Sequence, residues 1–455
     1  MIPKLALQKL GWTTAAFAIV QPLRLLNNVV LARLLAPQLL GLMLIVNTLR
    51  TGIAILSDIG INQNIVSHPK GDTTDFVDTA WTLQVIRGLG LSIICFLSAD
   101  LAARFFETPQ LRLILPIAAI FFIFGGFDST ARSLLQKRMA IKRMSFFEVV
   151  DAVQSLIVHV ALALITPTIW ALILASMIGA GWSLVASFLM VPGIRHRFVI
   201  NRYCALEMLH FGKWIFVSSL IWFVAVNFDR IFLAKTIPLA LLGVFGIART
   251  LSDTVTQLVL RGGSLLLFPM VASMQAGAWE VRQRLRRGRR IVLALAALGV
   301  ALFVATSDLI IGILYDARYR EAGILLPILL VGVWFAILST INESILLGLR
   351  KPAPAAIGNL AKLTVYAIGV PVAFQIYGIE GAVAFFSIGE AARYSILWLM
   401  GRFQHVGFLR DDVALTLLFF GAVAAFRSAL HWVGLVGSLG DLFPWVARMG
   451  IAWPL

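Results

Sequence analysis

Apolar residues fill the chain in long, nearly uninterrupted stretches, and short polar segments separate one stretch from the next. Stretches of about 20 residues or more are long enough to cross the hydrocarbon core of a bilayer as helices. Thirteen such stretches occur, at 12–35, 39–66, 77–103, 110–134, 146–166, 168–192, 212–236, 239–273, 289–314, 323–349, 355–377, 379–401 and 413–433. The pattern leaves open whether the tail at 434–455 lies at the membrane interface or forms a fourteenth span.

Composition supports a membrane protein that has no sizeable soluble domain. Of the 455 residues, 60% are hydrophobic and 13% are charged, whereas soluble domains carry about 25% charged residues. A net charge of +16 would indicate nucleic acid in a soluble protein, but here the basic residues lie in short loops between apolar stretches. We therefore expect no nucleic-acid partner. Cys95 and Cys204 lack a C-x-x-C context, so we expect no disulfide framework, no metal site and no cofactor.

The distribution of Lys and Arg predicts the orientation of the chain. The N-terminal stretch lacks a cleavage site and carries Arg24, Asn27 and Asn28, so we interpret it as a retained first span. With the N-terminus in the cytoplasm, the inside segments hold 22 basic residues and the outside segments hold 6. Such an excess over so many short loops favours this orientation.

An internal repeat predicts two related halves. Residues 27–49 align without gaps with residues 229–251 at an offset of 202, with a glycine, a threonine and a base among the matched positions. The repeat indicates the parallel-repeat architecture of secondary transporters, with an axis along the membrane normal. We predict an all-α membrane protein with an N-terminal six-helix bundle at 1–192, a cytoplasmic linker at 193–211, a C-terminal six-helix bundle at 212–401 and one or two additional spans at 402–455.

Several collinear segments resemble the Wzx-type polysaccharide flippases of the multidrug/oligosaccharidyl-lipid/polysaccharide exporter superfamily. The resemblance runs over about residues 5–400, and its motifs include ARLLAPQLLG, SDIGINQNIV, DTAWTLQVIRGLGL, ARFFETPQL, LLQKRMAIKRMSFFEV, FGKWIFVSSL, FDRIFLAKTIPLALLGVFGIARTL and LLFPMVASMQ. None of these motifs is a catalytic hallmark, and their succession carries the resemblance.

The resemblance implies a fold and a function. The fold would be two six-helix bundles around a central cavity. The function would be transfer of an undecaprenyl-diphosphate-linked oligosaccharide across a bacterial inner membrane for surface or exopolysaccharide biosynthesis. Membrane lipids, a polysaccharide polymerase and chain-length proteins are the further partners that it suggests. We expect no enzymatic activity and no catalytic residue, because no long loop could hold a catalytic domain and no phosphate-binding loop motif occurs.

Polar residues within the spans are the candidate functional groups, since a charge at membrane depth is costly unless it is used or neutralised. Guanidinium groups bind phosphate bidentately, and amides match sugar hydroxyls. The candidate substrate-binding residues are Arg24, Asn28, Arg50, Arg249 and Arg261. The candidate ion-coupling residues are Asp58, Asp253, Glu343 and Glu390.

Three alternatives stay open at this stage. Arg249 with Asp253, and Glu390 with Arg393, are spaced to form neutralising pairs on one helical face rather than ligand sites. The run of six Arg between Arg282 and Arg290 is interpreted as a cytoplasmic anchor, with anionic-lipid or diphosphate binding as the second interpretation. The alternative function is an ion-coupled multidrug exporter of the same fold.

Overall fold

The structure is a computed structural model that describes residues 4–55, 60–191, 194–274, 278–349, 351 and 353–443, and the side chains of 4–10, 209–218, 221–222, 259–274 and 278 lie outside this description. Two compact units can be separated, Met1–Gly243 and Val244–Leu455. The helices that begin in the first unit are α1 (Lys4–Leu34), α2 (Pro37–Ile55), α3 (Ile61–Ser67), α4 (Thr74–Leu97), α5 (Ala99–Phe105), α6 (Leu111–Ala118), α7 (Ile120–Phe127), α8 (Ala131–Lys137), α9 (Ile141–Ile165), α10 (Ile169–Leu189), α11 (Arg202–Thr236) and α12 (Leu239–Met274).

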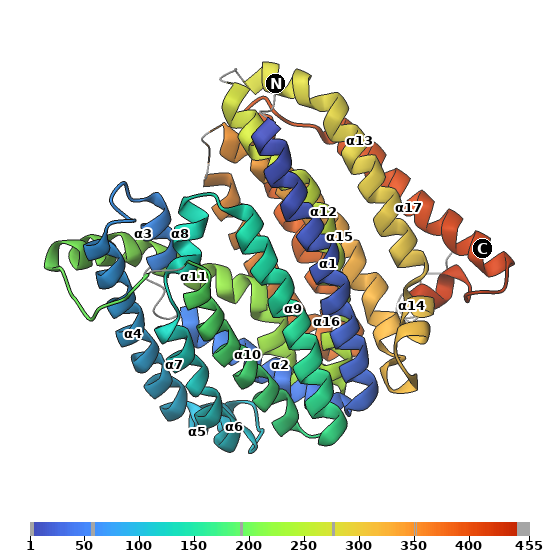
Figure 1. Ribbon diagram of the computed structural model, residues 1–455. Coiled ribbons are helices and arrows are strands. Elements are labelled where there is room, and N and C mark those ends of the chain that lie inside the picture. The colour runs from blue at the N-terminus through green and yellow to red at the C-terminus, as the bar shows by residue number, and fades with distance from the viewer. Residues whose placement is uncertain are drawn as a thin grey trace. The chain divides into compact units, whose positions relative to one another are not determined.

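The second unit contains most of α12 and all the later helices (Figure 1). These are α13 (Ala278–Ala305), α14 (Ser307–Leu314), the short 3-10 helix η1 (Ala317–Tyr319), α15 (Ala322–Gly348), α16 (Ala353–Phe403), α17 (Leu409–Trp432) and the 3-10 helix η2 (Leu439–Leu442). The division of the chain into bundles at 193–211 stays a prediction.

Long apolar helices confirm the predicted fold class. Within the described residues, ten helices are long and apolar enough to cross a membrane, or eleven if the bent pair 111–127 and 131–137 is one span. Helix α16 covers two predicted stretches, and α11 covers the stretch at 212–236. The protein is therefore an all-α, multi-pass membrane protein. Residues 444–455 lie outside the described residues, so the fourteenth span stays an open prediction.

Backbone breaks divide several of the predicted stretches. Gly378 interrupts α16 with φ 65° and ψ −151°, a conformation open essentially to glycine, and this break falls between the two predicted stretches. The apolar stretch at 39–66 holds two helices, α2 and α3, and α3 begins directly after Gly60, which has φ 60°. The stretch at 110–134 is broken, since Asp128 leaves the helical conformation with φ −51° and ψ 138° and a bend of 49° follows α7.

The predicted linker at 193–211 is partly helical. Its second part belongs to α11, which starts at Arg202 because the Asn201 side chain accepts hydrogen bonds from the backbone N–H groups of Tyr203 and Cys204. Residues 194–201 form an extended segment that lies along α4. The backbone N–H groups of Val199 and Asn201 donate to the hydroxyls of Thr82 and Thr79, at 3.1 and 3.0 Å. Side chains of α4 therefore hold this segment in place.

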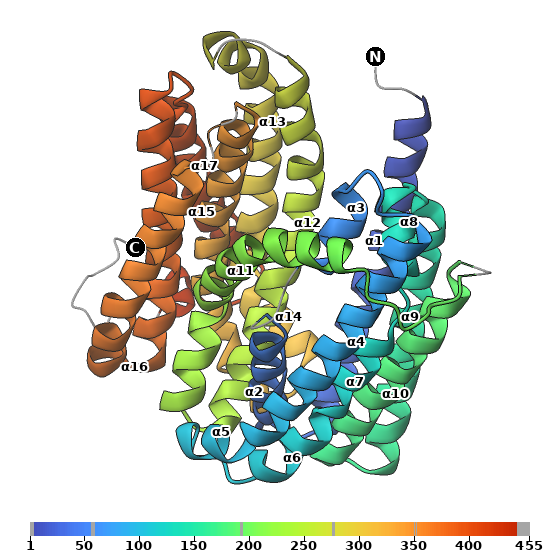
Figure 2. The same cartoon turned by 90° about the vertical axis from the view of Figure 1, so that its left-hand side faces the viewer.

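Small residues allow close helix packing in the first unit. Helices α4, α7 and α10 pack side by side, with α7 in the middle (Figure 2). A Cβ atom at Gly88 of α4 would lie 2.5 Å from the carbonyl oxygen of Phe122 and 2.7 Å from the Cα of Gly126 on α7. Because a side chain would force the two backbones apart, this contact requires glycine.

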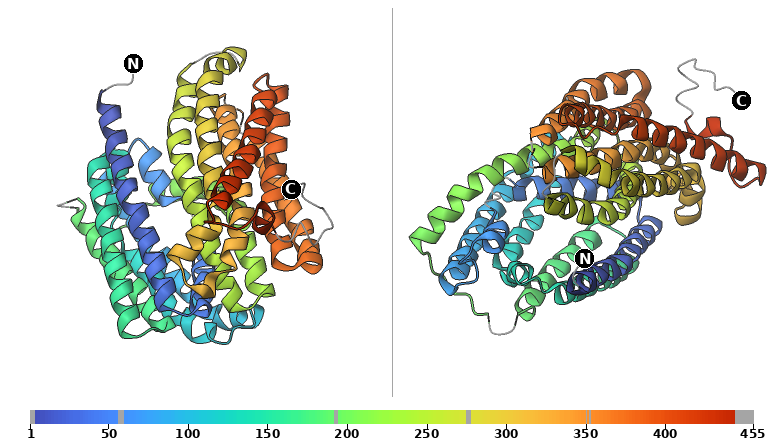
Figure 3. Two further views of the ribbon diagram at one scale, coloured as in Figure 1. Left: turned by 90° about the vertical axis from the view of Figure 1, so that its right-hand side faces the viewer. Right: turned by 90° about the horizontal axis from the view of Figure 1, so that it is seen from above.

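Buried aromatic and charged groups fix the last helices of the second unit. Trp334 of α15 is fully buried, stacks on Phe419 of α17 at 5.3 Å between ring centroids, and donates its indole N–H to Thr416. Arg427 of α17 is also fully buried and bonds both carboxylate oxygens of Asp308 at 2.7 and 2.8 Å. Helix α17 further packs along α13 (Figure 3), so the additional C-terminal helix belongs to the core of this unit.

Candidate functional site

Charged side chains from α15 and α16 form a linked cluster in the second unit. The Lys362 ammonium group donates to Glu390, and the Arg393 guanidinium group donates to Glu343. Arg393 also lies 3.8 Å from the second carboxylate oxygen of Glu390. The four side chains are between 11% and 22% exposed. Each carboxylate predicted to couple ions here is therefore held by a cation at membrane depth.

Helix α12 adds a fourth ion pair near this cluster. Arg249 and Asp253 lie one helical turn apart, with 3.3 Å between the guanidinium Nε and a carboxylate oxygen. Arg249 also lies near enough to Glu390 to act on it electrostatically. The cluster thus holds three cations and three carboxylates, so its formal charge is zero. The interpretation of Arg249 with Asp253 as a local neutralising pair agrees with this geometry.

The candidate residues of the first unit have a different environment. Arg24 on α1 is exposed, and Arg50 on α2 is half-buried with its guanidinium carbon 4.9 Å from the centroid of the Phe121 ring. Within the described residues, no carboxylate forms an ion pair with Arg24 or Arg50. Asn28 is half-buried on α1, one helical turn after Arg24. The first unit therefore offers basic side chains that the described carboxylates do not neutralise.

Two predicted site residues cannot be placed. Asp58 lies outside the described residues, and so does the side chain of Arg261, although its backbone belongs to α12. Arg24 and Arg50 belong to one compact unit, whereas Arg249, Asp253, Glu343 and Glu390 belong to the other. Within the second unit, the structure brings together all four of these residues.

The arginine run of α13 divides into buried and exposed members. Arg289 is 1% exposed, donates to Asp412 at 2.5 Å and to the Asn342 amide oxygen at 3.1 Å, and lies 4.4 Å from the centroid of the Phe408 ring. The Tyr394 hydroxyl donates to the other oxygen of Asp412 at 2.9 Å. From the sequence, this run is interpreted as one cytoplasmic anchor. In the structure, Arg289 of the run belongs to a buried network in the core.

Two further arginines of this run share one carboxylate. Arg286 and Arg290 both bond Asp411, at 2.8 and 2.5 Å, and are 52% and 54% exposed. They lie one helical turn apart on α13, so a single aspartate from α17 bridges them. This pairing is a surface feature, in contrast to the buried pair formed by Arg289.

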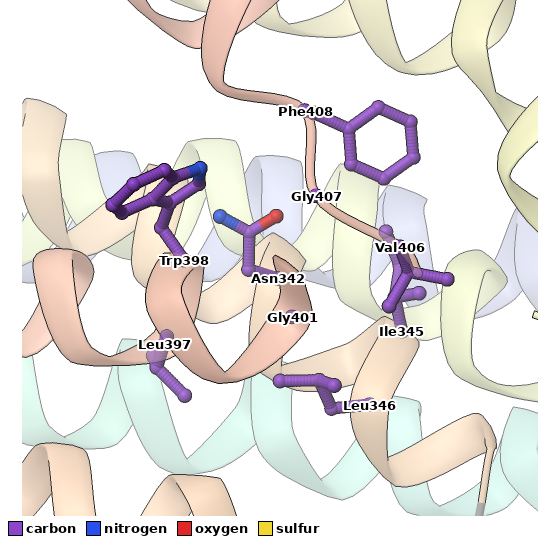
Figure 4. A pocket seen from close by; sticks show the side chains of 9 residues that line it. All are labelled: Asn342, Ile345, Leu346, Leu397, Trp398, Gly401, Val406, Gly407 and Phe408. Carbon is purple, nitrogen blue, oxygen red and sulfur yellow. The ribbon is translucent and has the colours of Figure 1, made fainter. Parts of the chain in front are cut away.

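A small pocket lies beside this network. Asn342, Trp398 and Phe408 surround it in Figure 4, and its volume is about 10 Å³. A cavity needs about 10–15 Å³ to hold one water molecule, so a sugar or a diphosphate does not fit there. The complete lining is Asn342, Ile345, Leu346, Leu397, Trp398, Gly401, Val406, Gly407 and Phe408.

Sequence reasoning missed the partners that complete the charged cluster. Lys362 is 28 residues from Glu390, and Arg393 is 50 residues from Glu343, so helical spacing could not pair them. The available signal was the occurrence of all four charges in neighbouring apolar stretches, because isolated charges at membrane depth tend to be paired.

Long apolar helices define the chain as a polytopic membrane protein, and ion pairs link several of these helices. A profile of the polysaccharide biosynthesis protein family matches residues 30–324. Because the match covers more than half of the chain, the protein belongs to this family. The resemblance to the Wzx-type polysaccharide flippases is confirmed.

Relatives of known role share low identity over much of the chain. The lipopolysaccharide biosynthesis protein WzxC of Escherichia coli K12 is 20% identical over 354 residues, which are 77% of this chain and 68% of that protein. The succinoglycan biosynthesis transport protein ExoT of Rhizobium meliloti 1021 is 22% identical over 64% of this chain and 57% of that protein. The chain thus spans about three fifths to two thirds of the length of these relatives.

Solved structures share the fold. The lipid II flippase MurJ in an inward closed conformation has a TM-score of 0.74 at 12% identity, with 96% of this chain and 95% of that chain covered. An inward-facing multidrug resistance MATE family transporter of the MOP superfamily has a TM-score of 0.62 at 13% identity, with 88% and 98% covered. At these identities the likeness shows the fold alone. Of these two structures that share the fold, one is a lipid flippase and the other is a multidrug resistance transporter.

Proposed function

We propose that this protein flips oligosaccharide repeat units linked to undecaprenyl diphosphate from the cytoplasmic to the periplasmic leaflet of a bacterial inner membrane. Membership of the polysaccharide biosynthesis family supports a transporter of this pathway. The distribution of basic residues supports a cytoplasmic N-terminus. Reporter fusions in the segments 67–76 and 315–322 test this orientation, because the first is expected in the cytoplasm and the second outside.

The contrast between the two units carries the proposal. Arg24 and Arg50 are basic groups without a described carboxylate partner, whereas the charged cluster of α12, α15 and α16 is internally neutral. A diphosphate binds most readily to cations that have no carboxylate to displace, and guanidinium groups bind it bidentately. In the proposed mechanism Arg24 and Arg50 hold the diphosphate and Asn28 contacts a sugar hydroxyl. Arg249 and Arg261 of the second unit stay proposed substrate-binding residues.

Alternating access is the proposed transport cycle. One bundle rocks against the other, and the head group must be held more tightly in one state than in the other to shift the equilibrium. Asp58, Asp253, Glu343 and Glu390 are the proposed coupling carboxylates. Because Glu343 and Glu390 are bound to Arg393 and Lys362, an ion could act on them only by exchanging these partners.

The alternative function is an ion-coupled multidrug exporter, which the MATE fold neighbours keep open. A cationic drug needs carboxylates that are free to bind it. The carboxylates of the charged cluster in the second unit already form ion pairs with Lys and Arg side chains. Deletion of the gene distinguishes the two functions. Loss of a surface or secreted polysaccharide, with lipid-linked repeat units accumulating in the inner leaflet, is expected. Normal polysaccharide with altered drug resistance would contradict the proposal.

Substitution of the two basic residues tests the mechanism. Arg24→Ala and Arg50→Ala should each reduce repeat-unit transport by roughly tenfold or more, the effect of removing one charge-assisted bond. Arg24→Lys should be nearly as impaired if contact is bidentate. Arg104→Ala is the matched control, because Arg104 is 72% exposed and pairs with Asp100. Normal transport by both alanine variants at equal membrane levels would exclude the proposed site.

A further inference from the structure

An apolar pocket lies in the first unit, and its lining contains none of the candidate site residues. Helices α2, α5 and α11 enclose it together with the end of α4, and its volume is about 430 Å³. These helices occupy neighbouring positions in Figure 2. The lining residues are Thr48, Leu49, Gly52, Ile53, Ser98, Leu101, Ala102, Phe105, Phe106, Leu220, Phe223, Val224 and Ile231.

The pocket offers no free polar group to a ligand. Its two hydroxyls are already used, since Thr48 donates to the carbonyl oxygen of Leu44 at 2.8 Å and Ser98 donates to that of Cys95 at 2.9 Å. The other lining side chains are aliphatic or aromatic. A ligand that fills this pocket must therefore be hydrocarbon, because a polar group would lose its hydrogen bonds there.

A cation lies at one end of the pocket. The Lys235 ammonium group is 5.8 Å from the centroid of the Phe105 ring, which lines the pocket, and 2.5 Å from a carboxylate oxygen of Glu107. In the predicted orientation both charged residues lie on the outer side of the membrane. The apolar wall of the pocket therefore lies directly beside a basic group, which we expect at the membrane surface.

Backbone strain marks Glu107 as more than a turn residue. Its φ angle is 53°, and it follows α5 at the position where glycine usually ends a helix. The N–H of Thr108 donates to the carbonyl oxygen of Ala103, which is the hydrogen bond of such a helix end. A non-glycine residue is disfavoured in this conformation. Its carboxylate, however, is placed to hold Lys235.

We propose that this pocket binds the polyprenyl chain of the carrier lipid in the outer half of the bilayer, with the lipid phosphate replacing Glu107 on Lys235. This inference rests on the proposed function for the identity of the carrier. A polyprenyl phosphate has one chain joined directly to its phosphate, which matches a cation beside the apolar wall. In a phospholipid, by contrast, a glycerol unit separates the hydrocarbon chains from the phosphate. The volume lies within the range of about 300–1,000 Å³ typical of ligand pockets, enough for a segment of the chain.

Photocrosslinking tests the location of the chain. The purified full-length protein is placed in phosphatidylethanolamine nanodiscs that contain a polyprenyl phosphate with a diazirine in its first isoprene units. Irradiation and peptide mapping should locate the crosslinks on α2, α5 and α11. Excess undecaprenyl phosphate should remove them, whereas the same excess of phosphatidylglycerol should not. Crosslinks elsewhere, or equal competition by phosphatidylglycerol, would overturn the proposal.

A matched pair of variants tests the pocket itself. Val224 lines the pocket and is 36% exposed, whereas Val153 on α9 is 39% exposed and lies outside it. Val224→Trp should reduce crosslinking roughly tenfold, the effect of excluding about two methylene groups from a buried site. Val153→Trp should leave it unchanged. Equal crosslinking in the two variants would contradict the proposal.

Charge variants test the phosphate contact. Lys235→Gln should weaken competition by undecaprenyl phosphate roughly tenfold, and Glu107→Gln should preserve or strengthen it, because the competing carboxylate is gone. Equal weakening by both variants would show that the ion pair only holds α5 against α11 and would overturn the phosphate site. These assays use a carrier without sugar, so they remain decisive even if repeat-unit flipping fails in the wild-type protein.

Discussion

Arg289 should be the most costly arginine to remove from the α13 run. Its guanidinium group and Asp412 are each 1% exposed and lie 2.5 Å apart. Arg289→Met would leave Asp412 with the Tyr394 hydroxyl as its remaining described side-chain partner. Breaking a buried pair on one side costs about 3–5 kcal/mol, so we expect a loss of this size in the free energy of unfolding. Denaturation of the purified protein by SDS, followed by circular dichroism, measures it.

Two further variants give this experiment its controls. Arg286→Met removes an arginine from the same helix that also binds an aspartate of α17, but Arg286 is 52% exposed, so the stability should barely change. The double variant Arg289→Met with Asp412→Leu should recover most of the loss, because neither buried charge then remains. Equal losses for Arg286→Met and Arg289→Met would refute the assignment of a buried structural role.

Three further predictions concern the first unit. Gly88→Ala should lower the melting temperature, because its Cβ would lie 2.5 Å from a backbone oxygen. Gly90→Ala on the same helix should not lower it, since a Cβ there meets nothing within 4 Å. A larger fall in melting temperature for Gly90→Ala than for Gly88→Ala would contradict the packing of α4 against α7. Glu107→Gly should not lower the melting temperature, because the left-handed backbone suits glycine; a clear fall would show that the exposed pair with Lys235 outweighs the strain. Burial lowers the pKa of His196, against the opposing charge of Asp78. The unfolded chain therefore takes up this proton first as the pH falls through about 6.5, and stability should decrease there in the wild type more than in His196→Gln. Melting curves between pH 5 and 8 compare the two.

Apolar length and turn chemistry made most of the helices predictable. Within the described residues, each of the thirteen stretches overlaps helices of the structure, and the break at Gly378 follows from a residue that tolerates positive φ. The extra helical turns at the start of α11 were missed. Their signal was Asn201, a good N-terminal cap, but the surrounding basic residues favoured a linker instead.

The candidate site was predictable only in part, because its contacts are long-range. The pair Arg249 and Asp253 follows from helical spacing. In contrast, Lys362 with Glu390 depends on how α16 folds back at Gly378, and Arg393 with Glu343 depends on the packing of α15 against α16. The sequence also gave no sign that Arg289 is buried while Arg286 is exposed, since both belong to one basic run.

The repeat has a direct counterpart in the local contacts between the starts of α2 and α12. Gly41 and Gly243 are equivalent at the offset of 202, and so are Pro37 and Leu239. A Cβ at Gly41 would lie 2.1 Å from the carbonyl oxygen of Leu239, and one at Gly243 would lie 2.0 Å from that of Pro37. Reciprocal contacts of this kind arise where a two-fold axis passes between equivalent residues. The close approach of α2 and α12 thus requires glycine both at 41 and at 243. This requirement explains why a glycine is among the residues that match between the two repeats.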